Sequence, residues 1–440
     1  MKKFFFLLFF FCASPLCAQN QDGKIISRVQ AQTTRMNPKV LLERFPLKPG
    51  DRFTAQAYDR AQDELHDMRV FKKLDFTLTP RPDNKLDINI SAEDGYFIFP
   101  LAFASGGGKS VAALSLAAGN LFKQGEMSFF FGGVSQDGFT VNAGTALGKH
   151  SFYAGYSKIN TNQRFYKNDW SNTFGVFSTS DDEGEYTQDL LAQVHTRKES
   201  FTFSYTRELT PDLSLFLRPE LARYQYADSS LIRLDPGAHN TLTAGLQISD
   251  NIRKGANMGA LSGYGLTDKK KSLTDLPKTR FGHAGKLFYT DGGSWSASDY
   301  RISKLGMQAT WLAEFKTRHL LALEIKAQNA FQAHFSDEIL STDLLSGQGR
   351  YDRQLRGQRG AGASAGFVYY LLRNNTGLLS LAPFYETAYV YRAGRYLNHS
   401  GAGATLSYKL WRFPFPVGIN YTHNLTDGSH QTAFVFGGAF

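Results

Sequence analysis

The chain has 440 residues, with 41 Gly, 37 Phe, 21 Tyr and a formal net charge of +10. Its two cysteines, Cys12 and Cys17, both lie near the N-terminus, so the rest of the chain has no disulfide, no thiolate nucleophile and no cysteine metal site. Abundant aromatic residues and glycines without a long apolar stretch are typical of a transmembrane β-barrel, in which apolar residues occupy every second position.

Residues 1–18 have the pattern of a secretory signal peptide. Two lysines follow Met1, then comes an apolar run of phenylalanines and leucines, then a small-residue exit, and cleavage is expected after Ala18. The apolar run is shorter than the ~20 residues that a spanning helix needs. Lipidation of Cys17 is the alternative, but it is preceded by Leu16, where lipidation signals use a small residue.

Signal-peptide removal takes away two of the positive charges and leaves the chain basic. A basic face could meet lipopolysaccharide phosphates or periplasmic accessory proteins. We expect no nucleic-acid partner, because an exported protein rarely meets one.

Residues 24–92 form a mixed segment with the expected order β-α-α-β-β and one small core. A strand is predicted over 24–31, a helix begins after Asn37 and ends before the break at 46–50, and a second helix begins after Thr54. Two alternating strands follow, around residues 74–78 and 86–90, joined by a turn at 80–84.

Residues 96–440 alternate apolar and polar side chains throughout, with no convincing helix. In one such stretch Leu321, Leu323 and Ile325 oppose Ala322, Glu324 and Lys326. The length predicts an all-β barrel of about sixteen antiparallel strands. Longer connections, expected on the outside, fall near 159–196, 268–299 and 333–361, and a short turn is expected at 210–213.

No catalytic, cofactor or metal site is predicted. Residues 362–366 match the G-x-S-x-G pattern of a nucleophile elbow, but they enter an alternating strand instead of a strand-to-helix turn. Residues 106–110, Gly-Gly-Gly-Lys-Ser, end like a phosphate-binding loop, yet no helix follows and a hairpin loop is expected. The ten histidines show no metal-ligand spacing, so we expect a non-enzymatic protein.

Arg356 and Gly357 lie late in the long connection at 333–361. A glycine-flanked arginine there can fold into the lumen, where its charge would seek a carboxylate. Glu386 is the candidate, because alternation places it on the polar face of its strand. The alternative is that Arg356 is a solvated residue of an external loop.

The chain resembles the BamA/TamA superfamily of outer-membrane assembly and translocation barrels. Residues 24–92 resemble a single POTRA domain, by Leu47-Lys48-Pro49-Gly50 and by the run from Arg60 to Leu74. Residues 355–358 resemble the family's Val-Arg-Gly-Phe/Tyr loop motif, and residues 384–388 resemble its Phe-x-Asp-x-Gly strand motif. The departures are Gln358 for the aromatic residue, Glu386 for the aspartate and Ala388 for the glycine.

The resemblance implies a barrel in the outer membrane with a periplasmic N-terminal domain that captures unfolded outer-membrane or secreted clients. It also implies a weak seam between the first and last strands. Pro100 removes a ladder hydrogen bond near the first strand, and the last strand contains Gly437 and Gly438 and ends on Phe440. Pro100 could instead end the linker from the N-terminal domain. Two other roles stay open: a dedicated secretion pore for one partner, and an accessory barrel of a larger complex.

Overall fold

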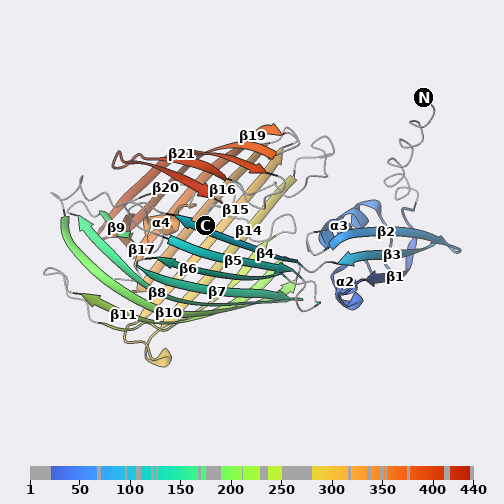
Figure 1. The fold of residues 1–440 in the computed structure, drawn as a ribbon, viewed down its shortest axis with the longest axis horizontal. Coiled ribbons are helices and arrows are strands. Elements are labelled where there is room, and N and C mark those ends of the chain that lie inside the picture. The colour runs from blue at the N-terminus through green and yellow to red at the C-terminus, as the bar shows by residue number, and fades with distance from the viewer. Residues whose placement is uncertain are drawn as a thin grey trace. The chain divides into compact units, whose positions relative to one another are not determined.

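A computed structural model gives the fold (Figure 1). The structure describes residues 21–66, 71–94, 97–105, 111–119, 123, 127–135, 137–166, 170–174, 190–210, 212–227, 236–249, 280–315, 319–333, 338–346, 351, 354–373, 377–410 and 417–436. The predicted signal peptide, the Gly-Gly-Gly-Lys-Ser segment, Gly437, Gly438 and Phe440 lie outside the described residues. Two compact units are distinguished: Met1–Ala102 with Leu114–Phe131 and Ala143–Phe152, and the rest of the chain.

The N-terminal part has the predicted element order. Its elements are β1 (Ile25–Thr33), α2 (Pro38–Arg44), α3 (Ala55–His66), β2 (Phe71–Arg81) and β3 (Lys85–Asp94). The strands form a sheet in the order β1-β3-β2, with β1 parallel and β2 antiparallel to β3. The β-α-α-β-β order expected from the sequence is therefore present.

Local chemistry explains where these elements begin and end. The side chain of Asn37 accepts a hydrogen bond from the Lys39 amide at 3.0 Å and caps α2, with Pro38 in the first turn. Thr54 accepts from the Ala57 amide at 3.2 Å and starts α3 in the same way. Asp83 and Asn84 adopt left-handed φ angles of 61° and 57° in the turn between β2 and β3.

A small core unites the helices and the sheet. One face of α3 packs into this core, because Tyr58, Ala61 and Leu65 are all buried. The rings of Phe53 and Tyr58 lie 5.3 Å apart, and Tyr58 meets Phe76 edge-on at 6.1 Å. Each large apolar side chain removed from water here contributes roughly 1.5–3 kcal/mol to folding.

In the rest of the chain, the described residues form an antiparallel barrel sheet of 20 strands. Strand order runs from β10 through β23 and continues β4-β5-β6-β7-β8-β9, with β8 also paired to β10. Four of these strands are short pieces, and among the described residues the other sixteen are longer, in agreement with the prediction. The strands are β4 (Phe97–Ser105), β5 (Val111–Gly119), β6 (Met127–Ser135), β7 (Gly138–Leu147), β8 (His150–Tyr166), β9 (Trp170–Phe174), β10 (Leu190–Thr210), β11 (Leu213–Ala227), β12 (Gly237–Ala238), β13 (Thr241–Ser249), β14 (Arg280–Gly292), β15 (Ile302–Phe315), β16 (His319–Gln332), β17 (Ile339–Leu340), β18 (Gln354–Gly357), β19 (Arg359–Arg373), β20 (Gly377–Arg392), β21 (Arg395–Leu410), β22 (Val417–Asn424) and β23 (His430–Phe436).

The two faces of the barrel wall differ as the alternation predicted. On β16, Leu323 and Ile325 are 43% and 42% exposed, whereas Glu324 between them is 2% exposed. On β20, Tyr385 is 48% exposed and Glu386 is fully buried. Apolar side chains that point outward and polar ones that point inward are what a membrane-spanning barrel requires.

Several connections differ from the prediction. The stretch 159–196 is shorter than expected as a connection, because β8 extends to Tyr166 and β10 begins at Leu190. Similarly, β14 occupies 280–292 within the expected connection 268–299. The ends of these long strands have polar side chains at alternate positions, so their composition resembles that of loops. Two short helices, η4 (Ser294–Ser296) and α4 (Ser341–Leu344), also contradict the expectation of no helix beyond residue 96.

The registers also show which barrel end each connection joins. Leu213 follows the predicted short turn, where Thr210 accepts from the Leu213 amide at 3.1 Å. Leu213 is opposite Ile248, and Ser249 is opposite Ala284, so residues 250–279 connect strand ends at the same side as this turn. Of the expected connection 268–299, residues 268–279 lie outside the described residues, and residues 293–299 follow β14 at the end opposite this turn, as expected for a long outer connection.

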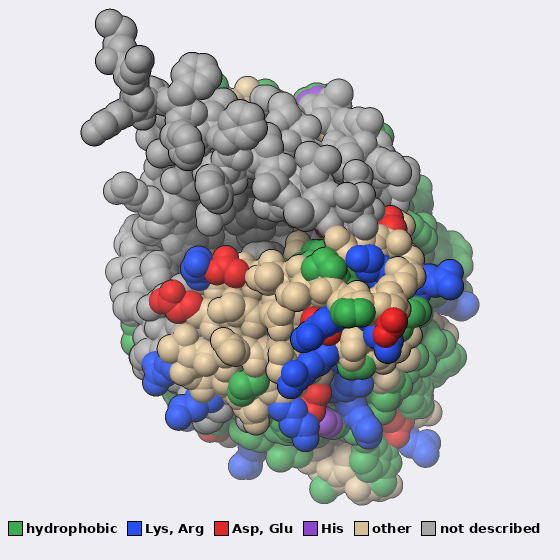
Figure 2. Space-filling model, turned by 90° about the vertical axis from the view of Figure 1, so that its right-hand side faces the viewer, with side chains coloured by type: hydrophobic (Ala, Val, Ile, Leu, Met, Phe, Trp, Pro, Cys, Tyr) green, Lys and Arg blue, Asp and Glu red, His purple; other side chains and the backbone are tan. Residues whose placement is uncertain are grey.

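Figure 2 shows Lys and Arg side chains interspersed with acidic and hydrophobic ones on the described part of one face. Within the described residues, no helix is long and apolar enough to cross a membrane.

Candidate functional site

The connection between β16 and β19 folds onto the inner face of the barrel. We call residues 338–358 the lumen segment; it contains β17, α4 and β18 (Figure 1). Its apolar side chains form a cluster with inward-facing residues of the wall. The buried members of this cluster are Ala330, Ile339, Leu344, Leu345, Leu355, Ala388 and Val390.

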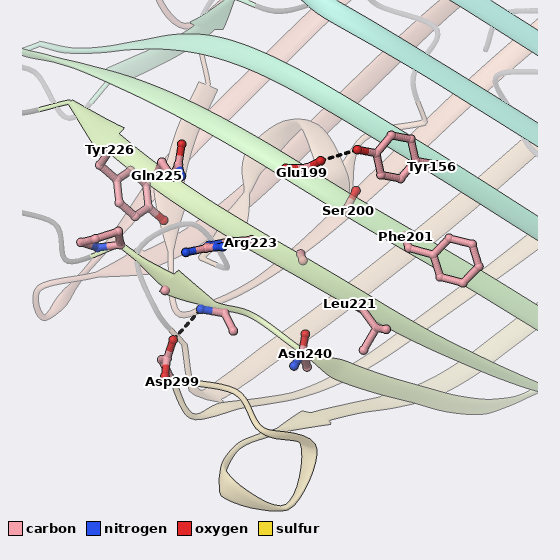
Figure 3. A pocket seen from close by; sticks show the side chains of 14 residues that line it. Tyr156, Glu199, Ser200, Phe201, Leu221, Arg223, Gln225, Tyr226, Asn240 and Asp299 are labelled. Carbon is pink, nitrogen blue, oxygen red and sulfur yellow. Dashed lines mark hydrogen bonds between the residues drawn. The ribbon is translucent and has the colours of Figure 1, made fainter.

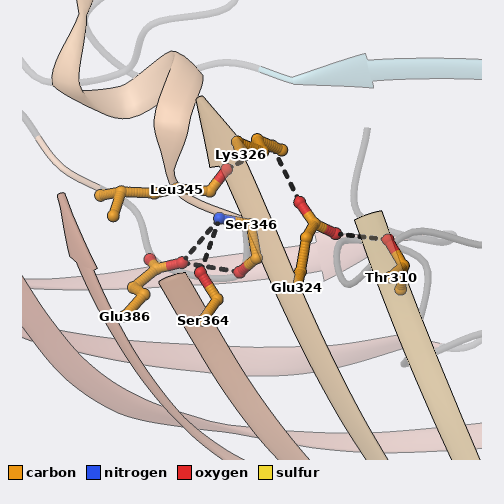
Figure 4. Close-up of polar contacts among 7 residues, drawn as sticks. All are labelled: Thr310, Glu324, Lys326, Leu345, Ser346, Ser364 and Glu386. Carbon is orange, nitrogen blue, oxygen red and sulfur yellow. Dashed lines mark hydrogen bonds and ion pairs between the residues drawn. The ribbon is translucent and has the colours of Figure 1, made fainter. Parts of the chain in front are cut away.

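Glu386 is the anchor of the lumen segment on β20. Its Oε2 atom accepts hydrogen bonds from the Ser346 amide at 3.0 Å and from the Ser346 hydroxyl at 2.6 Å (Figure 4). The Ser346 amide also lies 3.2 Å from the hydroxyl of Ser364 on β19. The buried carboxylate thereby fixes the position of Ser346 on the barrel wall.

A second polar contact lies on β16. Lys326 donates from Nζ to the carbonyl of Leu345 in the lumen segment (Figure 4). Its Nζ also lies 3.0 Å from Oε1 of Glu324, which is almost fully buried. The lysine thus joins the wall carboxylate to the segment, and its charge is neutralised inside the lumen.

A third contact involves His399 on β21. The Ser341 hydroxyl lies 2.7 Å from His399 Nδ1 and accepts from the Leu355 amide at 2.9 Å. Tyr351 meets the His399 ring edge-on, with centroids 4.6 Å apart. Burial, together with the charge of Glu386, raises the pKa of the Tyr351 hydroxyl above its usual value, so this group stays protonated.

The segment also reaches the opposite wall. β18 pairs with β9, with Leu355 opposite Trp170. The Arg356 guanidinium lies 5.8 Å from the ring centroid of Phe165 on β8, within the range of a cation–π contact. Because β8 is far from β20 in the strand order, the lumen segment extends from one side of the barrel to the other.

Close-approach glycines make room for this segment. A Cβ on Gly362 would lie 2.3 Å from the Leu344 carbonyl oxygen, and one on Gly401 would meet the ring of Tyr351. Gly357 likewise approaches the Tyr391 carbonyl. The 362–366 motif therefore sits mid-strand in β19, where Gly362 and Ser364 contact the lumen segment. This strand lacks the turn that exposes the serine of a nucleophile elbow.

The predicted site residues can now be placed. Arg356 is 5% exposed and lies in the lumen with Gly357, which contradicts the alternative of a solvated external loop. Gln358 is exposed, and its backbone bonds to Ala330 and Tyr391 at 2.7 and 3.0 Å. A direct ion pair between Arg356 and Glu386 stays a prediction. Pro100 lies within β4, whereas the other three seam residues are outside the described residues.

Sequence reasoning missed Ser346, Ser341 and His399. Serines carry no periodic signal, so nothing marked them as anchors. Glu324 and Lys326 were recognised as members of the polar face, but their contact with the segment depends on where that segment folds. Within the described residues, no group of three or more potential metal-ligating side chains is present.

The sequence matches no protein-family model and no curated protein. Among solved structures, CdiB from Acinetobacter baumannii and CdiB from Escherichia coli each have a TM-score of 0.58 and 13% identity, covering 94% of this chain and 73% of theirs. BamA from Haemophilus ducreyi lacking POTRA domains 1-3 has a TM-score of 0.48 and 12% identity, covering 93% of this chain and 83% of its own. At these identities the likeness to the CdiB structures concerns the fold, and the chain shares their barrel architecture.

Proposed function

We propose that this chain is an outer-membrane barrel of the BamA/TamA type that assists the insertion, assembly or translocation of other proteins. The observation that carries the proposal is the buried Leu355-Arg356-Gly357 sequence in a segment that crosses the lumen. The predicted signal peptide and the apolar outer face of the wall support an outer-membrane location. Under this proposal residues 24–92 are a periplasmic POTRA-like domain.

Client capture would use an edge of the N-terminal sheet. β2 stands at one end of the strand order β1-β3-β2, and its backbone can add an extended client strand by β-augmentation. Leu74, Phe76 and Leu78 on β2 pack against the small core, so the edge is held in extended form before a client arrives. Unfolded outer-membrane or secreted proteins have segments of alternating apolar and polar residues, which such an edge would bind as an added strand.

Client release into the membrane would need a seam between β4 and β23. Pro100 in β4 supports this, because proline cannot donate a ladder hydrogen bond. The role is then one of strand exchange and positioning, without covalent chemistry by the barrel. No cofactor is required for it.

A reconstituted assembly assay tests the proposal. The full chain is placed in lipid vesicles, an unfolded β-barrel client is added, and membrane insertion is followed by protease protection. We expect faster client insertion than in empty vesicles, and slower insertion with Glu386→Gln. Equal insertion with and without the chain would contradict the proposal.

The same assay separates the two other roles. A dedicated secretion pore would leave unrelated barrel clients unaffected and export one soluble partner across the vesicle membrane. An accessory barrel would do neither. Periplasmic accessory proteins, if needed, would restore insertion when a periplasmic extract is added.

A further inference from the structure

The outer face of the barrel contains a cationic site at one end of β10 and β11. On β11 the outward side chains from Leu213 to Leu221 are apolar, which matches the ~9–11 residues that a strand needs to cross a bilayer. The next outward positions are Arg223 and Gln225. On β10 the outward row changes in the same register, from Phe201 to Glu199 and then Arg197.

Three cations gather at this boundary. Arg223 is directly opposite Glu199, and Arg197 is opposite Gln225. Lys158 on β8 and both arginines attract the negative charge of Glu199. The inward bond between the hydroxyls of Ser157 and Ser200, at 2.8 Å, shows that the neighbouring residues Lys158 and Glu199 point outward.

Of these cations, Arg223 lines a hollow of about 840 Å³ together with Glu199 (Figure 3). Phe201 and Leu221 form its apolar side, and the segment 236–240 with Asp299 forms the side across from Arg223. Both carboxylates of the hollow are already engaged: Glu199 accepts from the Tyr156 hydroxyl, and Asp299 accepts from the Ala238 amide at 2.6 Å. Arg197 and Arg223 are exposed, and neither forms an ion pair within the described part of the chain.

The cluster lies at the end of β10 and β11 that is opposite the turn at 210–213. Residues 167–189 and 228–240 join strands there, whereas the short turn at 210–213 lies at the other end of β10 and β11. β4 directly follows residues 24–92, the proposed periplasmic domain, and counting the antiparallel strands from β4 puts the turn at 210–213 at the periplasmic end. The cations therefore stand where the headgroups of the outer leaflet begin.

We propose that Arg197 and Arg223, with Lys158, bind the phosphate groups of a membrane glycolipid headgroup of the lipid A class. The arginines supply planar donors for phosphate oxygens, and Phe201 and Leu221 contact the acyl chains below. The inference rests on the proposed outer-membrane location and not on any assembly activity. A lipid-binding measurement can therefore fail while the assembly assay succeeds, and the reverse.

The test is native mass spectrometry of the full chain in detergent micelles with three probes: diphosphoryl lipid A, monophosphoryl lipid A and inorganic pyrophosphate. We expect the order of affinity to be diphosphoryl, then monophosphoryl, then pyrophosphate. Arg197→Gln and Arg223→Gln should each weaken diphosphoryl lipid A binding about fivefold, the effect of removing one basic residue near an anionic lipid surface. Arg207→Gln is the matched control, because Arg207 is exposed on the same strand near the opposite end.

Glu199→Gln tests the same site if the arginine variants fold poorly. This change removes the negative charge beside the arginines and should tighten lipid A binding, an effect that unfolding cannot produce. Equal binding by all variants, or the same loss with Arg207→Gln, would overturn the assignment. Pyrophosphate binding as tight as lipid A would also overturn it, because the site would then select free phosphate and not a lipid.

Discussion

The anchor between Glu386 and Ser346 should behave as one coupled unit. Glu386→Ala removes a fully buried carboxylate and both of its bonds to Ser346. A hydrogen bond to a charged group contributes about 1.5–3 kcal/mol. The Ser346 amide keeps the Ser364 hydroxyl as a second acceptor at 3.2 Å, so the expected loss is at least that of the hydroxyl bond.

Ser346→Ala should cost a similar amount, because it removes the hydroxyl bond and leaves the buried carboxylate with one donor fewer. The double variant should be no less stable than the worse single variant, since both changes break the same bond. Unfolding by denaturant in detergent micelles measures the three free energies. Hydrogen exchange at α4 shows whether the loss is local to the lumen segment.

Ser380→Ala is the matched control. Ser380 is buried on the same strand, but its hydroxyl pairs with Ser407 at 2.8 Å on the neighbouring strand. This variant should lower stability without increasing exchange at α4. Losses that simply add in the Glu386 and Ser346 double variant would refute the reasoning, because they would show two independent contacts.

Three further predictions follow from other parts of the molecule. Gly362→Ala should displace α4 and increase its hydrogen exchange, because the new Cβ would collide with a backbone carbonyl, whereas Gly285→Ala meets its nearest atom at 3.6 Å and should leave exchange unchanged. The isolated fragment 24–92 should fold as a soluble monomer, because it has a core of its own. Burial raises the pKa of Tyr58 to about 12, so the fragment should lose stability as the pH rises from 10 towards 12. Below pH 10 the phenol is protonated in both states and stability is full; Tyr58→Phe should abolish the alkaline loss, as measured by circular dichroism. Deleting Phe440 should lower outer-membrane levels and leave periplasmic aggregates, because insertion machinery recognises the last strand by strand pairing; unchanged abundance in membrane fractions would contradict this.

The strands and their faces could be predicted because alternation is a local property. Leu323 and Glu324 differ in burial because neighbouring residues of a strand point to opposite faces, and the same holds for Tyr385 and Glu386. The number of long strands follows from chain length in the same way. The β-α-α-β-β order was equally readable, since Asn37 provides a helix cap that acts within a few residues.

The lumen segment could be predicted only in part. A glycine-flanked arginine and an inward carboxylate were visible in the sequence, but Ser346, which donates to Glu386, is a residue type without a sequence signal. The role of Gly362 and Gly401 could not be predicted, because the residues that they approach closely, Leu344 and Tyr351, are distant in sequence. The bounds of the connection expected at 268–299 were wrong, because residues 280–292 form β14 and the end of a strand is fixed by its register with the neighbouring strand.

The lumen segment contacts β20 through Ser346 and β8 through Arg356, and we expect it to obstruct the barrel lumen. Single-channel conductance in planar bilayers tests it most directly, by comparing the full chain with a variant in which residues 341–355 are replaced by a short Gly-Ser linker. We predict a small conductance for the full chain and a larger, steady one for the variant, because the segment then no longer occupies the lumen. An equally large conductance in both proteins would contradict the claim, since it would mean that the segment does not obstruct the pore.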